Sequence, residues 1–277
     1  MDSMEKHRKA FHLSHSSRLE GVKTVFYIFI IILVTIPIAS YRFTEFTRER
    51  LIEEFEKKHK AKVLLMVHRV EKVGFFGIPI REFIQERDAE SILSTLQAIP
   101  PETPIILILH TPGGEILPSF QIARALKKHP GKVTVYIPHY AMSGGTLIAL
   151  AADRIVMSPN AALGPVDPQI NWKGETYPAI SVLKAINQSK EEGIVLSLDD
   201  MILADLAYKS LKQVEEMVRW IFEERLPISK VDAIVKRLIY SESTHDAPIF
   251  PDEAKKLGLP IETNLPKEVF ELIKTAY

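Results

Sequence analysis

The chain has 277 residues, of which 46% are hydrophobic and 25% charged, a composition typical of a globular protein with one large or two small domains. Its formal net charge is zero and it has no long basic block, which argues against nucleic acid as the main partner. The absence of cysteine excludes a cysteine nucleophile, a disulfide framework and a thiolate metal site.

The first feature along the chain is an uncharged, mostly apolar stretch at residues 24–41, which follows a polar tail at residues 1–23. At about 1.5 Å per helical residue the stretch reaches roughly 27 Å, just enough to cross the hydrocarbon core of a bilayer. A cleaved signal peptide is the alternative, but Pro37-Ile38-Ala39-Ser40 is only a weak cleavage site and the preceding tail is long. We expect a single-pass membrane anchor. Basic residues flank it on both sides and leave its orientation undetermined.

Residues 42–60 are dense in charge and carry apolar side chains at helical spacing, which predicts an amphipathic juxtamembrane helix. In residues 61–277 apolar strand patterns alternate with helical patterns. We expect strands at 63–70, 105–109, 132–137 and 154–157, and helices at 82–98, 116–128, 144–152, 201–224, 229–239 and 252–257. This alternation indicates βαβ crossovers and a mainly parallel sheet, so residues 61–277 are predicted to form one α/β domain.

Two Gly-Gly turns follow neighbouring strands of this domain. Gly113-Gly114 comes after the strand at 105–109, and Ser143 stands directly before Gly144 after the strand at 132–137. A serine in a strand-to-helix turn presents its hydroxyl, and glycine backbone can approach it closely. A lone Gly-Gly turn is more often a plain tight turn, but two on consecutive βα units, one of them carrying serine, favour a nucleophile facing an oxyanion hole.

Several motifs carry a wider resemblance. They are Thr111-Pro112-Gly113-Gly114, Ala141-Met142-Ser143-Gly144-Gly145, Ala151-Ala152-Asp153-Arg154-Ile155, Ser158-Pro159-Asn160, Leu163-Gly164-Pro165-Val166-Asp167-Pro168-Gln169, Thr244-His245-Asp246-Ala247-Pro248 and Glu253-Ala254-Lys255-Lys256-Leu257-Gly258-Leu259. In order and spacing, over roughly residues 62–262, they resemble the Clp protease/crotonase superfamily. Within it the chain is most similar to the serine dehydrogenase proteinase family, membrane-associated relatives of signal peptide peptidase A.

The resemblance implies a spiral of ββα units with a mainly parallel sheet and a ring-like homo-oligomer. It also implies Ser143 as the nucleophile, and an oxyanion hole made by the backbone of Gly113 or Gly114 together with that of Gly144. The chain departs from the Clp-type pattern at the triad histidine. That residue would follow the Pro-Asn turn, where this sequence has Val166.

The identity of the base that accepts the Ser143 proton is therefore undecided by the sequence. Relatives of signal peptide peptidase A use a lysine, and Lys184 is the first candidate because the apolar run before it would favour a neutral amine. His245-Asp246 is the rival, since Asp246 falls where the Clp-type triad aspartate would and His245 precedes it.

Two further histidines, His110 and His139, lie near the two turns and are expected to form the wall of the site. No His-x-x-x-His pair encloses a glutamate, so a metal site has little support.

We therefore expect a single-pass membrane-anchored serine peptidase that cleaves membrane-associated polypeptides without a cofactor or metal. A crotonase-type acyl-CoA enzyme would share the fold, but Ser143 and the anchor count against it. A non-catalytic membrane scaffold is supported by the absent triad histidine. The sequence does not separate the peptidase from the scaffold.

Overall fold

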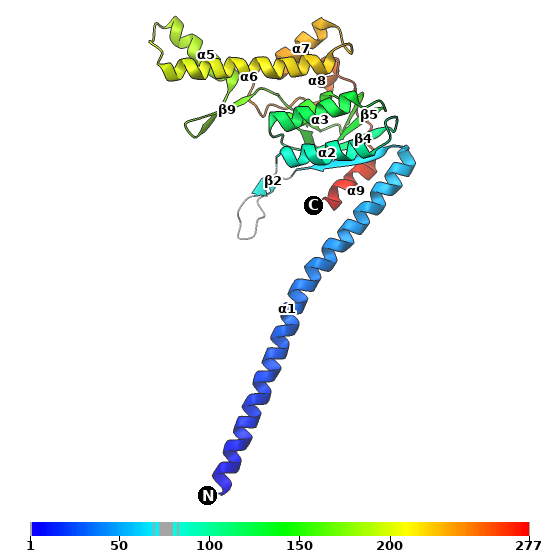
Figure 1. Cartoon of the computed structure of the whole chain (residues 1–277), viewed down its shortest axis with the longest axis vertical. Coiled ribbons are helices and arrows are strands. Elements are labelled where there is room, and N and C mark those ends of the chain that lie inside the picture. Colours follow the sequence, from blue (N-terminus) through cyan, green and yellow to red (C-terminus); the bar gives the residue numbers. More distant parts are fainter. Residues whose placement is uncertain (1, 69, 72–79, 82, 277) are drawn as a thin grey trace. The chain divides into compact units, whose positions relative to one another are not determined.

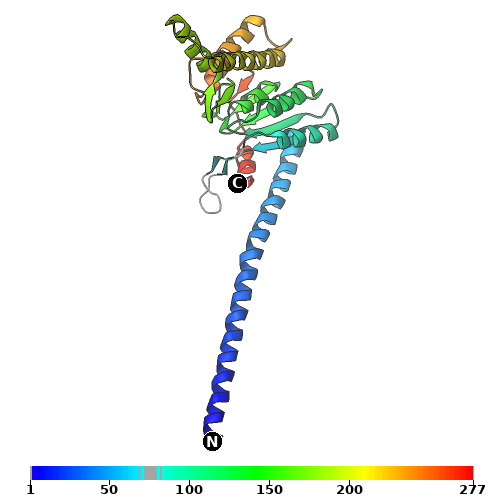
Figure 2. The same ribbon diagram turned by 60° about the vertical axis from the view of Figure 1, so that its left-hand side comes forward.

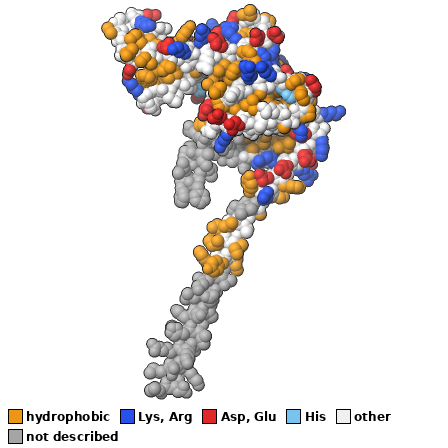
Figure 3. Space-filling view, viewed as in Figure 1, with side chains coloured by type: hydrophobic (Ala, Val, Ile, Leu, Met, Phe, Trp, Pro, Cys, Tyr) orange, Lys and Arg blue, Asp and Glu red, His pale blue; other side chains and the backbone are white. Residues whose placement is uncertain are grey.

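The computed structural model describes residues 2–68, 70–71, 80–81 and 83–276, which fall into two compact units, one reaching to Glu53 and the other spanning Glu54–Ala276. Helix α1 (Asp2–His59) forms the first unit and continues into the second. Among the described residues, one helix is long and apolar enough to cross a membrane, and that stretch lies in Phe26–His59. Its large apolar side chains are exposed, as the orange stretch of this helix in Figure 3 shows.

The second unit is built around a parallel sheet of five strands. In spatial order they are β1 (Lys62–Val67), β4 (Ile105–His110), β5 (Val133–Ile137), β7 (Arg154–Met157) and β11 (Ile261–Glu262). Each pairs in parallel with the next. Because every crossover moves to the next strand in the same direction and with the same hand, the crossover helices gather on one face of the sheet.

Helices α2 (Glu86–Ala98), α3 (Ile116–Lys128) and α4 (Gly144–Leu150) cover this face, with α3 packed between the other two. Figure 1 shows α2 and α3 lying alongside each other over the strands. The predicted α/β class with a mainly parallel sheet is therefore confirmed.

Strands β4 and β5 form the centre of the core. Every residue in both strands is buried, which is why apolar residues dominate both stretches of the sequence. Full burial of an aliphatic side chain contributes roughly 1.5–3 kcal/mol relative to exposure, so this pair is the best-anchored part of the sheet. Both Gly-Gly turns begin at the carboxyl ends of these strands.

Some predicted boundaries hold and others are wrong. The helix at 116–128 and the strand at 154–157 have the predicted bounds. The helix expected at 82–98 begins only at Glu86, because Ile84 is extended and bridges to Gly114 while Gln85 and Asp88 form a capping box. Glu82 lies outside the described residues. The strand expected through Val70 ends at Val67, and Val70 belongs to a separate antiparallel pair, β2 (Val70–Glu71) with β3 (Ile80–Arg81).

Shorter elements complete the second unit. β6 (Tyr140–Ala141) pairs with β8 (Ala162–Leu163), and β9 (Gln169–Trp172) forms a hairpin with β10 (Glu175–Pro178). Helix α5 (Ala179–Glu191) packs along the long helix α6 (Leu198–Phe222), as Figures 1 and 2 both show. The remaining helices are α7 (Ile228–Leu238), α8 (Pro251–Lys256) and α9 (Lys267–Thr275).

Candidate active site

Ser143 lies in the turn between β6 and α4 and has a strained backbone, with φ 49° and ψ −120°. A non-glycine residue held in such a conformation costs about 1–3 kcal/mol and persists only where its surroundings fix it. Here the turn is held on both sides: Met142 N–H donates to Thr111 O at 3.0 Å, and Leu147 N–H donates to Ser143 O at 3.1 Å. The strain presents the serine side chain to a cavity, as in a nucleophile elbow.

The Gly113-Gly114 turn packs directly against Ser143. Gly113 has a φ of 106°, and a Cβ added there would lie 2.7 Å from the Ser143 Cβ, so only glycine fits. Gly113 O accepts a hydrogen bond from Ile84 N–H at 2.8 Å. Because C=O and N–H point in opposite directions across a trans peptide, this bond turns the Gly114 N–H away from Ile84.

The three glycines that were expected to form the oxyanion hole differ in what their amides do. Gly113 N–H donates to Thr111 Oγ1 at 3.1 Å and is already engaged. Among the described residues, the N–H groups of Gly114 and Gly144 have no protein acceptor. These two amides are therefore the ones available to a bound oxyanion.

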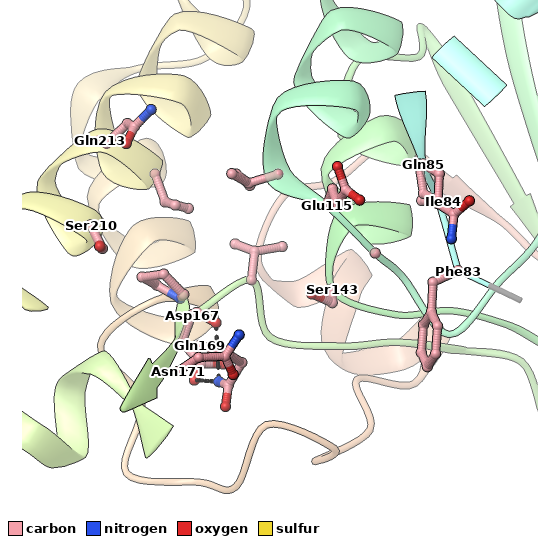
Figure 4. A pocket seen from close by; sticks show the side chains of 15 residues that line it. Phe83, Ile84, Gln85, Glu115, Ser143, Asp167, Gln169, Asn171, Ser210 and Gln213 are labelled. Carbon is pink, nitrogen blue, oxygen red and sulfur yellow. Dashed lines mark hydrogen bonds between the residues drawn. The ribbon is translucent and has the colours of Figure 1, made fainter. Parts of the chain in front are cut away.

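A cavity of about 530 Å³ opens in front of Ser143. In Figure 4 Ser143 lies between Glu115 and Phe83 on one side and Asp167 and Gln169 on the other. The cavity lining comes from the segment before α2, the Gly113-Gly114 turn, the segment after β8 and helix α6: Phe83, Ile84, Gln85, Gly114, Glu115, Ile116, Ser143, Val166, Asp167, Pro168, Gln169, Asn171, Ser210, Gln213 and Val214. Its mixture of apolar and amide side chains suits a peptide, which has both apolar side chains and backbone hydrogen-bonding groups.

Val166, the residue that the resemblance aligns with the histidine of Clp-type peptidases, lines the cavity together with Ser143. Its backbone N–H donates to Leu238 O at 2.8 Å and its side chain is buried. An aliphatic side chain cannot accept a proton, so any base must come from elsewhere.

His245 pairs with Asp167. Its Nδ1 lies 2.8 Å from Asp167 Oδ1, while the second carboxylate oxygen of Asp167 accepts from Gln169 Nε2 at 2.8 Å. Asp167 is buried and lines the cavity, whereas His245 is not among the lining residues and contacts the cavity wall through Asp167 and Gln169. Asp246 is exposed and stands apart from this pair. The Thr244 hydroxyl donates to its carboxylate, and this hydrogen bond lowers the pKa of Asp246.

Lys184 lies on α5 and is not among the residues that line the cavity. Val182 and Ile186 are buried on one face of that helix, whereas half of the Lys184 side chain is exposed and its Nζ lies 2.9 Å from Glu242 Oε1. The sequence suggested an apolar setting for Lys184, but the structure does not provide one. Val182 and Ile186 stand two residues before and after Lys184, and residues at that spacing lie on different faces of a helix. A role for Lys184 in the reaction stays a prediction.

His110 and His139 do not line the cavity either. Their ring centroids are 5.4 Å apart, and His110 also packs on Tyr140. Burial, followed by the charges of His139 and His68, lowers the pKa of His110 to about 4. Within the described part of the chain, no group of three or more His, Asp or Glu side chains is arranged to hold a metal ion.

Sequence reasoning missed the contribution of α6. Ser210, Gln213 and Val214 reach the cavity from this helix, yet they form part of an ordinary amphipathic pattern with no local signal of a site. The pairing of Asp167 with His245 depends on the β8 segment and the 241–250 loop meeting through the Leu163–Ile249 bridge.

Comparison with known proteins places the chain among peptidase sequences. A family model described as a ClpP-like SDH-type serine proteinase matches residues 14–276. An uncharacterized protein of Methanocaldococcus jannaschii is 44% identical over 244 residues, 87% of this chain and 82% of that protein. The membrane protein NfeD1b of Bacillus subtilis is 31% identical over 98 residues, 35% of this chain and 22% of that protein. A solved structure of a mutant membrane-bound stomatin-specific protease has a TM-score of 0.45 and 19% identity, over 70% of this chain and 79% of that chain.

Proposed function

Because the chain belongs to the family of ClpP-like SDH-type serine proteinases, we propose that it is a membrane-anchored serine peptidase with Ser143 as its nucleophile. The family that the sequence motifs indicated is confirmed. The observation that carries the proposal is the strained turn of Ser143 next to the unengaged amides of Gly114 and Gly144. The family match favours peptide hydrolysis over the acyl-CoA chemistry of crotonases.

In the proposed reaction Ser143 Oγ attacks the carbonyl carbon of the scissile peptide bond and gives its proton to a base. The carbonyl oxygen becomes an oxyanion, which receives hydrogen bonds from Gly114 N–H and Gly144 N–H. The protonated base then gives its proton to the leaving amine, and water hydrolyses the resulting acyl-enzyme ester. Each amide of an oxyanion hole typically contributes a factor of ~10²–10³ to the rate.

Two side chains compete for the role of base, and each has one supporting observation. Lys184 is supported by the resemblance to peptidases that use lysine, and reaching Ser143 would require its helix to be repositioned. His245 is supported by its pairing with Asp167, a residue of the cavity wall. A carboxylate at Nδ1 is what orients an imidazole so that the other nitrogen can accept a proton.

We propose membrane-associated polypeptides as substrates. The support is the apolar stretch of α1, which would keep the second unit at a membrane as a single-pass anchor, together with the family match. The cavity lining fits an extended peptide, since it combines apolar side chains at Phe83, Ile116 and Val166 with amides at Gln169 and Gln213. No cofactor enters the proposed reaction.

We also propose that the protein assembles with copies of itself. The loop and helix turns that join α5 to α6 expose several large apolar side chains: Ile194, Val195, Leu198, Met201, Ile202 and Leu206. Figure 3 shows orange patches over this part of the molecule. Val195 is 94% exposed, an unusual position for valine in a monomer. Light scattering of the purified protein tests this proposal. We expect Val195→Lys to lower the mass of the assembly. A monomeric parent chain would contradict the proposal.

The function itself is tested by peptide hydrolysis. We expect the full chain in detergent to cleave casein or a fluorogenic peptide, and Ser143→Ala to abolish cleavage with the thermal unfolding temperature unchanged. Ser94→Ala, which removes an exposed hydroxyl on α2, is the matched control and should retain full activity. Undiminished cleavage by Ser143→Ala would contradict the proposal. Inactivity of the parent chain would favour the non-catalytic scaffold.

A further inference from the structure

A buried histidine lies behind the Gly113-Gly114 turn, outside the cavity that Ser143 lines. His68 follows β1 and is 5% exposed. Its backbone N–H donates to His110 O at 2.8 Å. Its Nδ1 lies 2.9 Å from Thr111 Oγ1, and its Nε2 lies 3.4 Å from Asp88 Oδ2. A carboxylate, an imidazole and a hydroxyl therefore stand in a row that ends at the first residue of the Thr-Pro-Gly-Gly motif.

Thr111 connects this row to both turns of the site. Its side chain is fully buried, and its Oγ1 accepts the Gly113 N–H at 3.1 Å. Its backbone pairs with the segment before Ser143, since Thr111 N–H donates to Tyr140 O at 3.1 Å and Thr111 O accepts from Met142 N–H. A change confined to the Thr111 hydroxyl therefore acts first on the glycine turn. The Ser143 side is held by the backbone pairing and by the Thr111 methyl, which a Cβ added at Gly145 would approach to 2.4 Å.

The distances favour one arrangement of the protons. Thr111 Oγ1 accepts the Gly113 N–H, and its own proton has two acceptors within reach. The choices are His68 Nδ1 at 2.9 Å and Gly113 O at 3.4 Å, and the shorter contact is to the histidine. Asp88, which also accepts Gln85 N–H at 2.8 Å, faces Nε2 and favours the tautomer that carries its proton there.

The glycine turn needs such support because two consecutive glycines have no side chains to restrict their dihedral angles. Gly113 O is held by Ile84 N–H, and Gly113 N–H is held by Thr111. These two bonds fix the peptides on either side of the Gly113 Cα, and hence the direction of the Gly114 N–H. Even a partial rotation of the peptide between Gly113 and Gly114 would turn the Gly114 N–H away from the oxyanion.

We propose that His68 is a positioning residue of the oxyanion hole. It holds the Thr111 hydroxyl in the rotamer that binds Gly113 N–H, and thereby aims the Gly114 amide at the carbonyl oxygen of the substrate. Asp88 sets the His68 tautomer. The inference rests on the proposed peptidase function. It adds three residues, Thr111, His68 and Asp88, which support the glycine turn without touching the substrate.

The test compares matched variants of the full chain by kcat and KM on a fluorogenic peptide. Thr111→Val removes the hydroxyl and keeps the shape, whereas Thr111→Ser keeps the hydroxyl. His68→Leu removes the acceptor, whereas His68→Asn keeps a polar atom near the position of Nδ1. Thr134→Val is the control for losing a hydroxyl from a buried threonine of the same sheet.

We expect Thr111→Val and His68→Leu each to lower kcat by about 10- to 100-fold with little change in KM, less than the loss of a whole donor. Thr111→Ser and His68→Asn should recover most of the rate, and Thr134→Val should lose none. The double variant His68→Leu/Thr111→Val should be no slower than Thr111→Val, because His68 acts through the hydroxyl.

Multiplicative losses in the double variant, or a normal kcat in Thr111→Val, would overturn the positioning role. If Ser143→Ala leaves hydrolysis unchanged in the same assay, the peptidase function itself fails and the inference fails with it. Loss of activity in Ser143→Ala together with full activity in Thr111→Val would reject only the role of His68.

Discussion

The two sides of the cavity around Ser143 are built differently. The side that carries Ser143 and the glycine turn is formed by segments that follow the buried strands β4 and β5, and short backbone hydrogen bonds hold each peptide. The opposite side is formed by Asp167 and Gln169, which contact the partly exposed His245. Lys184 stands further out in an exposed ion pair.

In the mechanism that we propose, the oxyanion hole is therefore preorganised within one chain, whereas the proton acceptor depends on side chains that can be repositioned. Preorganised donors need no rearrangement during the reaction, which is the source of their catalytic effect. An exposed ion pair such as Lys184–Glu242 contributes little to stability, so it is easily exchanged for another partner. The following predictions test the two sides separately.

The largest expected effect concerns the base. On the basis of the resemblance, we predict that Lys184→Ala lowers kcat by about 10²–10⁴, the usual contribution of a general base, and that His245→Ala lowers it much less. Glu242→Gln releases Lys184 from its ion pair and should leave kcat intact or raise it. Steady-state kinetics of the three variants gives the ranking. The opposite order for Lys184 and His245 would assign the role to His245, oriented by Asp167.

The second prediction addresses the preorganised side. A Cβ added at Gly114 would lie 2.3 Å from the backbone N and O of Ile84, so Gly114→Ala must displace the turn. We expect kcat to fall by about 10²–10³, the effect of losing one oxyanion donor. Gly193→Ala is the control, because Gly193 also has a positive φ, 73°, but no atom lies within 4 Å of the added Cβ. Normal turnover by Gly114→Ala would show that this turn is not part of the site.

The third prediction concerns stability against pH on the β4 side. Burial lowers the pKa of His110 to about 4, whereas an unfolded histidine takes up its proton near pH 6.5. Between these values the unfolded state binds more protons, so the free energy of unfolding should fall as the pH drops from about 6.5 to about 4, by about 2–3 kcal/mol. His110→Phe should flatten this part of the curve in denaturant titrations. An unchanged slope would contradict the assignment to His110.

The smallest expected effect concerns the anchor. A chain that begins at Arg42 retains the whole second unit, including the buried Phe55, and should cleave a soluble peptide with unchanged kcat. It should also be released from membranes by alkaline carbonate, which the full chain resists. Retention of the shortened chain would contradict the anchor. A mature protein that begins after Ala39 would identify the segment as a signal peptide.

The features that the sequence allowed us to predict are local. Apolar residues dominate β4 and β5, and glycines that the backbone requires follow both strands, so the sheet and the Ser143 turn could be predicted from residues within a short stretch. Helix α6 was likewise predicted, at 201–224, although it begins earlier, at Leu198, where Ser197 and Asp200 form a capping box. In each of these cases the determining contacts join residues that are close in the chain.

The features that could not be predicted depend on distant contacts. Ile84 lies within an apparently helical pattern, yet its pairing with Gly114 keeps it extended, because a bridge to the turn replaces the first helical turn. Lys184 follows apolar residues, but its helix directs them inward and the lysine outward. The pair of His245 with Asp167 joins segments 78 residues apart and leaves no pattern in either of them.

The most direct test of the account is the structure of the protein after reaction with a fluorophosphonate. We predict a single covalent adduct on Ser143 Oγ, with the phosphonyl oxygen about 3 Å from both Gly114 N and Gly144 N. Gly113 N should remain bonded to Thr111 Oγ1, as it is in the unreacted chain. An adduct on another residue, or an oxygen held by Gly113 N in place of Gly114 N, would contradict a preorganised oxyanion hole at this turn.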